Sequence, residues 1–409
     1  MSRVGSMSAS PGERAGGRVL ILVENLPVPF DRRVWLESKA LTRAGWLVSV
    51  ICPKGGPWTA DYEEIEGVHI HRYEPAPPTK GALSYVWEFL YCWLQTLRLT
   101  IGVAAGRGFD VIHACNPPDT FFAIGAFFKL WGKKFLFDQH DLCPEVYVAR
   151  FNREGFWYAA LGMLERLTYV TADLVIATNQ SYRETAIRRG GVDPERVFVV
   201  RSGPESSRFV GLPPDPALKR GRPYLLAYLG VMAPQDGVDH LIRATADLIA
   251  LRGKRDVAVT LIGGGDSFDD LVALTKEMGL DDVVHFTGRI SDTDVEAVLS
   301  TADVCVSPDP KNPLNDVSTM NKVLEYMAVG RPMVSFDLRE TRYSAGEGSL
   351  YATPNETTDL AAKVNLLLED PALRASMGAY NRERFRQGFA WEYSQVELVK
   401  AYELLRPHA

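Results

Sequence analysis

Short apolar runs alternate with amphipathic helical segments along almost the whole chain of 409 residues. Thirteen runs rich in Val, Ile, Leu and Phe are predicted to be strands. They lie at 18–24, 47–52, 68–73, 110–115, 134–138, 172–178, 196–200, 224–230, 257–263, 283–288, 302–307, 332–337 and 349–353. Strands that are apolar on both faces and alternate with helices indicate parallel sheets covered by helices on both sides. The sequence therefore predicts an α/β fold of doubly wound, Rossmann-like sheets.

The strand count and one Gly- and Pro-rich stretch predict two domains. Thirteen strands are too many for one comfortable doubly wound sheet, and SGPESSRFVGLPPDPALKRGRP has the composition of a linker. The expected divisions are a disordered tail over 1–17, an N-terminal domain over 18–205, a linker over 206–222 and a C-terminal domain over 223–388. A cleft between the domains is the expected active site, because ligands bind beyond the carboxyl ends of strands in open α/β sheets.

Composition and charge narrow the class of protein. Hydrophobic residues at 46% and charged residues at 23% are typical of a globular protein and exclude a disordered or fibrous chain. The net charge of −6 gives no reason to expect nucleic-acid binding. The five cysteines show no CxxC spacing, which favours a reducing compartment. With no signal peptide or spanning apolar run evident, we expect a cytoplasmic protein, free or at the inner face of the cytoplasmic membrane.

Charged residues between the first strand and the first helix form one candidate site. Asp31, Arg32 and Arg33 open the predicted helix. A helix N-terminus beside two adjacent arginines favours an anion, so these three residues are candidate contacts for a diphosphate or an acceptor. The alternative is a solvated first turn with Asp31 as its N-cap.

Two histidines lie at the ends of predicted strands. His113 belongs to DVIHAC, and His140 follows KFLFDQ with Asp141 directly after it. A histidine just past a strand is well placed to hydrogen-bond a substrate hydroxyl or to transfer a proton. We predict His140 and Asp141 as catalytic residues and His113 as a further contact. The alternative for each histidine is a structural role.

A glycine turn follows the strand VAVTLI. Gly263, Gly264 and Gly265 would allow a ligand to approach the backbone closely, but such turns are also packing devices between strand and helix. The turn is not a complete GxGxxG, and no acidic residue follows at the dinucleotide spacing, which counts against an NAD enzyme. We predict these glycines as part of the donor site.

The segment LNDVSTMNKVLEYMAVGRPMVSFD carries the clearest site pattern. One face of the predicted helix is apolar, and the opposite side carries Thr319, Lys322 and Glu325 at intervals of three. Asp316 and Ser318 are candidate N-caps. A helix N-terminus with a lysine suits a diphosphate, and a carboxylate further along could accept hydrogen bonds from a ribose diol. The alternative is an exposed Lys–Glu pair, but we predict Ser318, Thr319, Lys322 and Glu325 as donor-binding residues.

At this point the chain resembles the retaining family 4 glycosyltransferases of GT-B fold, over about residues 18–405. The motifs that carry the resemblance are DRRVWLESKALTRAGWLVSVICP, FDQHDLCPE, LGVMAPQDGVDHLIRA, LIGGGD, HFTGRISDTDVEAVLSTADVCVSP and NKVLEYMAVGRP. The segment FAWEYSQVELVKAYELL is similar to the family's last helix, which packs back onto the acceptor-side N-terminal domain; here it spans 389–405. The C-terminal domain is then expected to bind the nucleotide sugar.

The resemblance implies roles for three matching positions. Glu325 matches the glutamate that binds the nucleotide ribose, the turn at 263–265 matches the one that approaches the nucleotide, and His140 matches a histidine that contacts sugar near the reaction centre. It also implies cleavage of the donor C1–O bond with retained configuration, in which helix ends and basic residues rather than a metal stabilise the leaving diphosphate. We predict no metal site and no cofactor, and a UDP-sugar as the expected donor.

The chain departs from the family pattern in three places. The usual glutamate eight residues before Glu325 is replaced by Val317, and no basic residue lies between Gly230 and Asp239, where the family has its diphosphate-binding pair. The N-terminal glycine-rich loop is replaced by PFDRR. We take Lys322 as the substitute cation, supported by Arg32 or Arg33. The pattern NDVSTMNKVLEYMA resembles a branch associated with bacterial surface polysaccharides.

The resulting prediction is transfer of a hexose-type sugar from a nucleotide-diphosphate donor to a glycan or lipid-linked acceptor. A GT-B nucleotide-sugar epimerase is one alternative. A non-catalytic glycosyltransferase-like subunit of a polysaccharide complex is another, favoured by the missing diphosphate cations and first glutamate.

The segment LSYVWEFLYCWLQTLRLTIG at 83–102 bears on partners, because five aromatic residues fall within nine positions. Aromatic amphipathic helices can lie in a membrane interface, whereas Glu88 and Arg98 argue against spanning. A helix buried against the N-terminal sheet is the alternative. Peripheral membrane contact through this segment would suit a lipid-linked acceptor.

Overall fold

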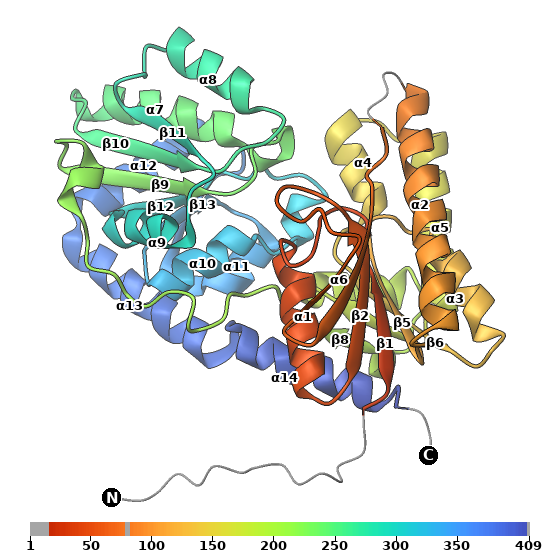
Figure 1. Cartoon of the computed structure of the whole chain (residues 1–409). Helices are drawn as coiled ribbons and strands as arrows, with labels where there is room; N and C mark the ends of the chain where they lie inside the picture. Colours follow the sequence, from red (N-terminus) through yellow and green to blue (C-terminus); the bar gives the residue numbers. More distant parts are fainter. Residues whose placement is uncertain (1–15, 78–81, 407–409) are drawn as a thin grey trace, which may run out of the picture.

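The chain folds around two separate β-sheets, as the computed structural model shows for residues 16–77 and 82–406 (Figure 1). The tail expected over 1–17 lies outside the described residues except for Gly16 and Gly17. The Gly16 amide donates to the carbonyl of Gly45, and the Gly17 carbonyl accepts from the amide of Leu47. These last tail residues are therefore held at the start of the first sheet.

The first sheet has eight strands in the order β3-β4-β2-β1-β5-β6-β7-β8. Its strands are β1 (Arg18–Leu22), β2 (Leu47–Pro53), β3 (Tyr62–Ile65), β4 (Val68–Tyr73), β5 (Val111–Cys115), β6 (Lys134–Gln139), β7 (Leu174–Ala177) and β8 (Val197–Val199). Its helices are α1 (Arg32–Arg43), α2 (Ala82–Ala105), α3 (Phe122–Lys129), α4 (Cys143–Phe151), α5 (Phe156–Thr171) and α6 (Gln180–Arg188). Every predicted strand of this half is confirmed. The apolar pattern missed β3, whose polar sequence YEEI pairs antiparallel with β4 at the half-solvated sheet edge.

The second sheet has six parallel strands in the order β11-β10-β9-β12-β13-β14. Its strands are β9 (Tyr224–Leu229), β10 (Val257–Ile262), β11 (Val284–Gly288), β12 (Val304–Ser307), β13 (Met333–Phe336) and β14 (Ser349–Ala352). Its helices are α7 (Val238–Arg252), α8 (Phe268–Glu277), α9 (Asp292–Thr301), α10 (Asn321–Val329), α11 (Arg339–Ala345) and α12 (Thr357–Glu369). Helices cover both faces, so the central strands are fully buried, as their unbroken apolar runs predict.

The end of the chain crosses from the second sheet to the first. α13 (Pro371–Gly388) packs on α10, and α14 (Trp391–Glu403) contacts α1 and β8. Figure 1 shows these two helices running along the underside of the molecule. Trp391 and Tyr402 of α14 are buried in the apolar cluster that also contains β1 and β2 residues. The last helix is therefore part of the first domain's core.

Two helix starts position candidate site residues. Asp31 caps α1, as the alternative for this segment expected, because its carboxylate accepts from the Val34 amide at 3.1 Å. The prediction for the later helix is wrong: α10 begins at Asn321 with Met320 at the N-cap position, so neither Asp316 nor Ser318 caps it. The Asp316 carboxylate instead accepts from the amide of Arg339.

The strand orders fix where the site residues gather. The strand order reverses between the parallel neighbours β1 and β5 in the first sheet and between β9 and β12 in the second, because the connections that follow the two strands lead to opposite edges of the sheet. Ligands in doubly wound folds bind at these switch points, beyond the carboxyl ends of the strands. Most of the predicted polar residues lie in the segments that follow β1, β6 and β12.

Candidate active site

Residues that follow the central strands of both sheets meet at the domain junction. Arg32 at the start of α1 forms an ion pair with Asp292 at the start of α9. The Arg32 guanidinium also lies 3.8 Å from the Glu325 carboxylate of α10. Helix α4 contacts the short 3-10 helix Pro234–Asp236 that follows β9. The fold therefore brings the two switch points together.

Glu325 lies among cations from the first domain and from the linker. Arg208 of the linker forms a close ion pair with Glu325 and lies 3.5 Å from Asp292. The Arg208 guanidinium also stacks over the ring of Phe209 at 4.9 Å. The carboxylate is 14% exposed, whereas the Arg32 side chain is 52% exposed. An anion bound beside Glu325 would thus have Arg32 and Arg208 within reach.

Lys322 is buried and paired, which differs from the exposed cation that the pattern suggests. Its ammonium lies 2.6 Å from Asp309 and 3.8 Å from Asp236. Burial alone would lower the pKa of Lys322, but the two carboxylates raise it above its ordinary value. Burial raises the pKa of Asp236 to about 6 although the lysine opposes this shift. The lysine charge is therefore balanced within the protein at the switch point of the second sheet.

Ser318 and Thr319 take part in contacts between the two domains. The Ser318 hydroxyl lies 2.9 Å from the Tyr182 hydroxyl of α6. Thr319 donates to the carboxylate of Glu340 at 3.4 Å, and the same carboxylate accepts from Ser181 at the start of α6. These two predicted donor-binding residues therefore lie at the junction but have their hydroxyls engaged by neighbouring side chains.

The glycine turn packs against the loop that follows β9. A Cβ at Gly263, whose φ is +126°, would collide with the carbonyl oxygen of Gly230. At Gly265 it would lie 2.6 Å from the carbonyl oxygen of Met232. A Cβ at Gly264 would meet open space. Packing between loops thus requires two of the glycines, whereas a side chain at Gly264 would meet no neighbouring atom.

His140 is held in place from two sides. Its Nε2 lies 2.5 Å from Asp138, whose carboxylate also accepts two hydrogen bonds from Arg33 at 2.6 and 3.0 Å. The Asn116 side chain accepts from the amides of His140 and Asp141 at 2.7 and 3.1 Å. The His140 side chain is 18% exposed. Burial raises the pKa of Asp141. The structure therefore presents His140 at the first domain's switch point.

Two predicted contacts are placed where no diphosphate or acceptor reaches them. Arg33 is buried and forms ion pairs with Asp138 and with Glu37, the latter at 3.2 Å. His113 is fully buried beneath α14, where its Nδ1 lies 2.7 Å from the Tyr402 hydroxyl. Burial lowers the pKa of His113. We therefore correct the earlier assignment: Arg33 and His113 are interior residues, and Arg32 alone of the arginine pair faces the junction.

One buried set has the chemistry of metal ligands. Atoms of His113, Cys115 and Asp138 lie within 4.8 Å of one another. Both oxygens of Asp138 accept hydrogen bonds from Arg33, so the carboxylate is already neutralised by a guanidinium. We assign this set to an ion-pair cluster.

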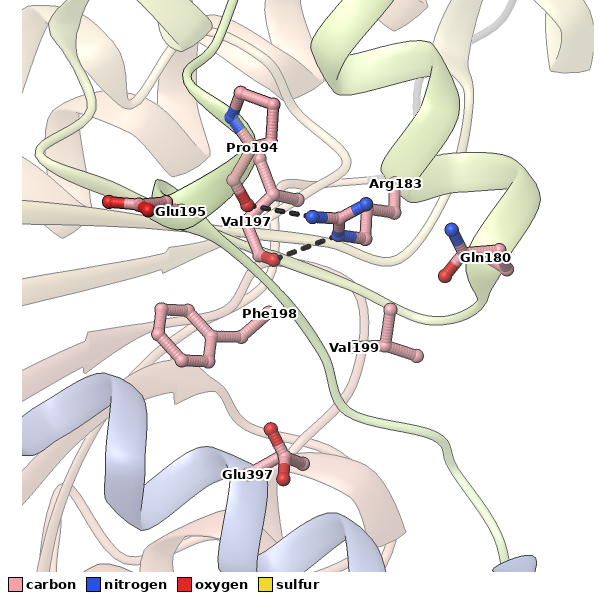
Figure 2. Close-up of a pocket in the computed structure, with 8 residues that line it drawn as sticks. All are labelled: Gln180, Arg183, Pro194, Glu195, Val197, Phe198, Val199 and Glu397. Atoms are coloured by element: carbon pink, nitrogen blue, oxygen red, sulfur yellow. Dashed lines mark hydrogen bonds between the residues drawn. The ribbon is translucent and has the colours of Figure 1, made fainter.

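A surface pocket lies away from all these residues. Figure 2 shows it at the outer edge of the first sheet, beside β8, with α6 and α14 around it. Arg183 crosses this edge and donates to the carbonyls of Val197 and Pro194. These hydrogen bonds engage the edge strand at Val197 and the turn before it at Pro194, and none of the predicted site residues lines the pocket.

Sequence reasoning missed four residues that shape the site. Glu37 follows Arg33 by four positions, so the helical spacing already signalled an ion pair on α1. Asp138 lies within a strand, which is unusual for a charged residue and could have been noticed. Nothing local marks Arg208 in the linker or Glu340 in α11, because their partners are distant in sequence.

Each half of the chain matches a family model. Residues 31–203 match the "Glycosyl transferase 4-like domain", and residues 223–370 match "Glycosyl transferases group 1". The two models together cover more than half of the chain, and both describe glycosyltransferases. The chain therefore belongs to the group 1 glycosyltransferases.

Similar proteins include enzymes of this class. MMP alpha-(1->4)-mannosyltransferase from Mycolicibacterium hassiacum is 28% identical over 265 residues, which is 63% of this chain and 61% of that protein. The chain thus spans about three fifths of the length of the first curated relatives it matches.

Similar solved structures cover almost the whole chain. Sucrose-phosphate synthase from Thermosynechococcus elongatus superposes with a TM-score of 0.73 at 20% identity, over 95% of this chain and 99% of that one. HepE from Anabaena, in complex with UDP and glucose, gives 0.69 at 16% identity, over 95% and 99%. At these identities the likeness establishes the fold, which is GT-B.

Proposed function

We propose that the chain is a retaining hexosyltransferase of family 4 type. It would move a sugar from a nucleotide-diphosphate sugar, with a UDP-sugar as the expected donor, to a glycan or lipid-linked acceptor. Cell-surface polysaccharide or glycoconjugate synthesis is the expected setting. The proposal rests on family membership and on similar structures, among which HepE is in complex with UDP and glucose.

One observation carries the proposal most strongly. Glu325 stands at the meeting point of the two domains, with Arg32 and Arg208 beside it. A carboxylate can accept hydrogen bonds from both hydroxyls of a ribose, and neighbouring guanidinium groups suit the attached diphosphate. The donor would therefore bind with its ribose on α10 and its phosphates towards Arg32.

The departing diphosphate needs positive charge. The family's basic pair is missing, and Lys322 is balanced by Asp309 and Asp236. We therefore propose that Arg32 and Arg208, together with the first turn of α10, supply most of this charge, with Lys322 in support. No metal is required by this arrangement.

Acceptor dependence tests the proposed activity. We expect the purified protein to release UDP from UDP-hexoses only when a polyprenyl-diphosphate-linked sugar is present, and to keep its rate in EDTA. Conversion of one UDP-sugar into another without acceptor would show the epimerase instead. Nucleotide binding without turnover against a panel of lipid-linked and free glycans would favour the non-catalytic subunit.

We further propose that the outer face of α2 contacts a membrane. One side of α2 packs on β2 and β4, with Cys92 and Thr96 buried. Its other side exposes Trp87, Phe89 and Leu90, each by almost half.

Further exposed apolar residues lie on other helices of the first domain. They are Phe127, Leu130 and Trp131 at the end of α3, and Phe156 and Trp157 of α5. Among helices of the described residues, none is both long and apolar enough to cross a bilayer.

Vesicle binding tests this membrane contact. We expect Trp87→Ser/Leu90→Ser to co-sediment with phosphatidylglycerol vesicles several-fold less than wild type, because apolar area inserted into the interface is lost. Leu404→Ser removes a residue that is 64% exposed directly after α14 and should bind vesicles like wild type. Equal sedimentation of all three proteins would contradict the proposal.

A further inference from the structure

Two carboxylates face the buried ammonium of Lys322, and they hold it unequally. The carboxylate of Asp309 is 1% exposed and accepts from the ammonium at 2.6 Å and from the Ser307 hydroxyl. Asp236, at the end of the 3-10 helix that follows β9, is 18% exposed and lies 3.8 Å from the ammonium, too far for a hydrogen bond. Its other oxygen accepts from the Ala233 amide at 3.1 Å. Asp309 is therefore the fixed partner of the lysine, and Asp236 is the more exposed and loosely held one.

This cluster carries one negative charge too many to receive an anion. One ammonium faces two carboxylates at the switch point of the second sheet, where doubly wound folds bind ligands. The segment between Gly230 and Asp239 adds no basic residue. Glu325, beside which the nucleotide is proposed to bind, lies one helical turn from Lys322 on α10. A diphosphate attached to a ribose there would approach Lys322 and meet the repulsion of Asp236.

We propose that Asp236 couples donor binding to proton uptake: it takes up one proton from solvent as the diphosphate binds, and so releases Lys322 to the phosphate oxygens. Without the charge of Asp236, the ammonium and Asp309 form a neutral pair that no longer repels an anion. The protonated carboxyl group can also donate a hydrogen bond to a phosphate oxygen. The inference rests on the proposed function for the identity of the ligand, and it adds a control of the same site by pH.

The groups that face Asp236 within the second domain favour this proton. Among the described residues they are Lys322 of α10, Asp309 after β12 and Tyr228 of β9. Burial and the charge of Asp309 raise the pKa of Asp236 to about 6, although Lys322 opposes the shift. Burial also raises the pKa of Tyr228 well above its ordinary value, so this hydroxyl stays neutral and donates to the carbonyl of Val231. A bound diphosphate adds negative charge, which would raise the pKa of Asp236 further.

The first domain adds no free charge at this place. Helix α4 contacts the 3-10 helix that ends at Asp236. Its two charged side chains are engaged elsewhere: Glu145 forms an ion pair with Arg189, and Arg150 lies 3.7 Å from Asp266. The balance between Lys322 and its two carboxylates is therefore set within the second domain.

The affinity for a nucleotide sugar is expected to fall as the pH rises above about 6, the pKa of Asp236 in the free protein. Below this pH the free protein already holds the proton. Above it the complex holds a proton that the free protein lacks, so each further pH unit weakens binding by up to about tenfold until the pKa of the complex is passed.

Isothermal titration with UDP-glucose at about pH 6, 7 and 8 measures this coupling, because the diester diphosphate of that ligand keeps its charge over the range. We expect the Kd of wild type to rise about tenfold from the lowest to the highest pH. Titrations in buffers of different ionisation enthalpy should show proton uptake on binding. Asp236→Asn keeps an oxygen for the Ala233 amide. We expect this variant to take up no proton and to bind about tenfold tighter than wild type at about pH 8.

Asp239→Asn is the matched control. It removes the same charge three positions further along, where the carboxylate lies 3.3 Å from the ring of His240, so we expect the pH dependence of wild type. UDP-glucose binding by wild type without proton uptake would overturn the inference, whether or not Asp236→Asn folds. Equal Kd values for wild type and Asp236→Asn at every pH would overturn it as well, and either result would leave the proposed function standing. Absence of binding by all these proteins would overturn the proposed function, and the inference with it.

Discussion

Replacing Arg33 by alanine is expected to lower the free energy of unfolding by about 3–5 kcal/mol, because it leaves the charge of Asp138 buried without its partner. Asp138 is fully buried and accepts two hydrogen bonds from the guanidinium. The loss also removes donors to the carbonyl of Val200 and to Ser202. Urea unfolding monitored by circular dichroism measures the change.

The neighbouring arginine provides the control. Arg32→Ala removes an ion pair with Asp292 in which both side chains are more than half exposed. Exposed pairs contribute less than about 1 kcal/mol, so this variant should unfold close to wild type. Similar losses from the two substitutions would show that the Arg33 cluster is not the buried ion pair described above.

The sequence predicted the fold because its signal is local and repeated. Each central strand is a run of apolar residues bounded by turn residues, and burial on both faces of a parallel sheet requires that pattern. β3 escaped prediction because an edge strand needs no such run. The start of α10 was misplaced because Asp316 and Ser318 resemble caps by type, whereas tertiary contacts with α11 and α6 engage them.

The sequence predicted which types of residue lie in the site and which strands they follow. It did not predict which of these side chains pair with one another. His140 and Glu325 lie on the side of their sheets that faces the domain junction. Their positions after strands predict this placement. The balancing of Lys322 by Asp236 and Asp309 depends on two loops brought together by the sheet order. Arg33 and Arg32 are adjacent in sequence, yet the helix turns one into the core and the other towards α9. Only the packed structure separates such neighbours.

Replacing Glu325 by alanine is expected to weaken nucleotide-diphosphate binding by about 100-fold or more. Hydrogen bonds to a charged group contribute about 1.5–3 kcal/mol each, and two ribose hydroxyls would lose theirs. Glu325→Gln keeps one acceptor oxygen and should lie between wild type and Glu325→Ala. Isothermal titration with UDP measures the effect. A Kd within about twofold of wild type would remove Glu325 from the donor site.

The most direct test of the central claim is a thermal-shift panel with UDP, GDP, ADP, dTDP and their sugars on wild type, Glu325→Ala and Lys311→Ala. A ligand that binds the folded state raises its Tm by mass action. Lys311, which is exposed and donates to the carbonyl of Asp337, serves as the control. We predict a selective shift for uridine nucleotides that persists in Lys311→Ala and disappears in Glu325→Ala. No shift with any nucleotide, or an equal shift in Glu325→Ala, would contradict a nucleotide-sugar donor site at the domain junction.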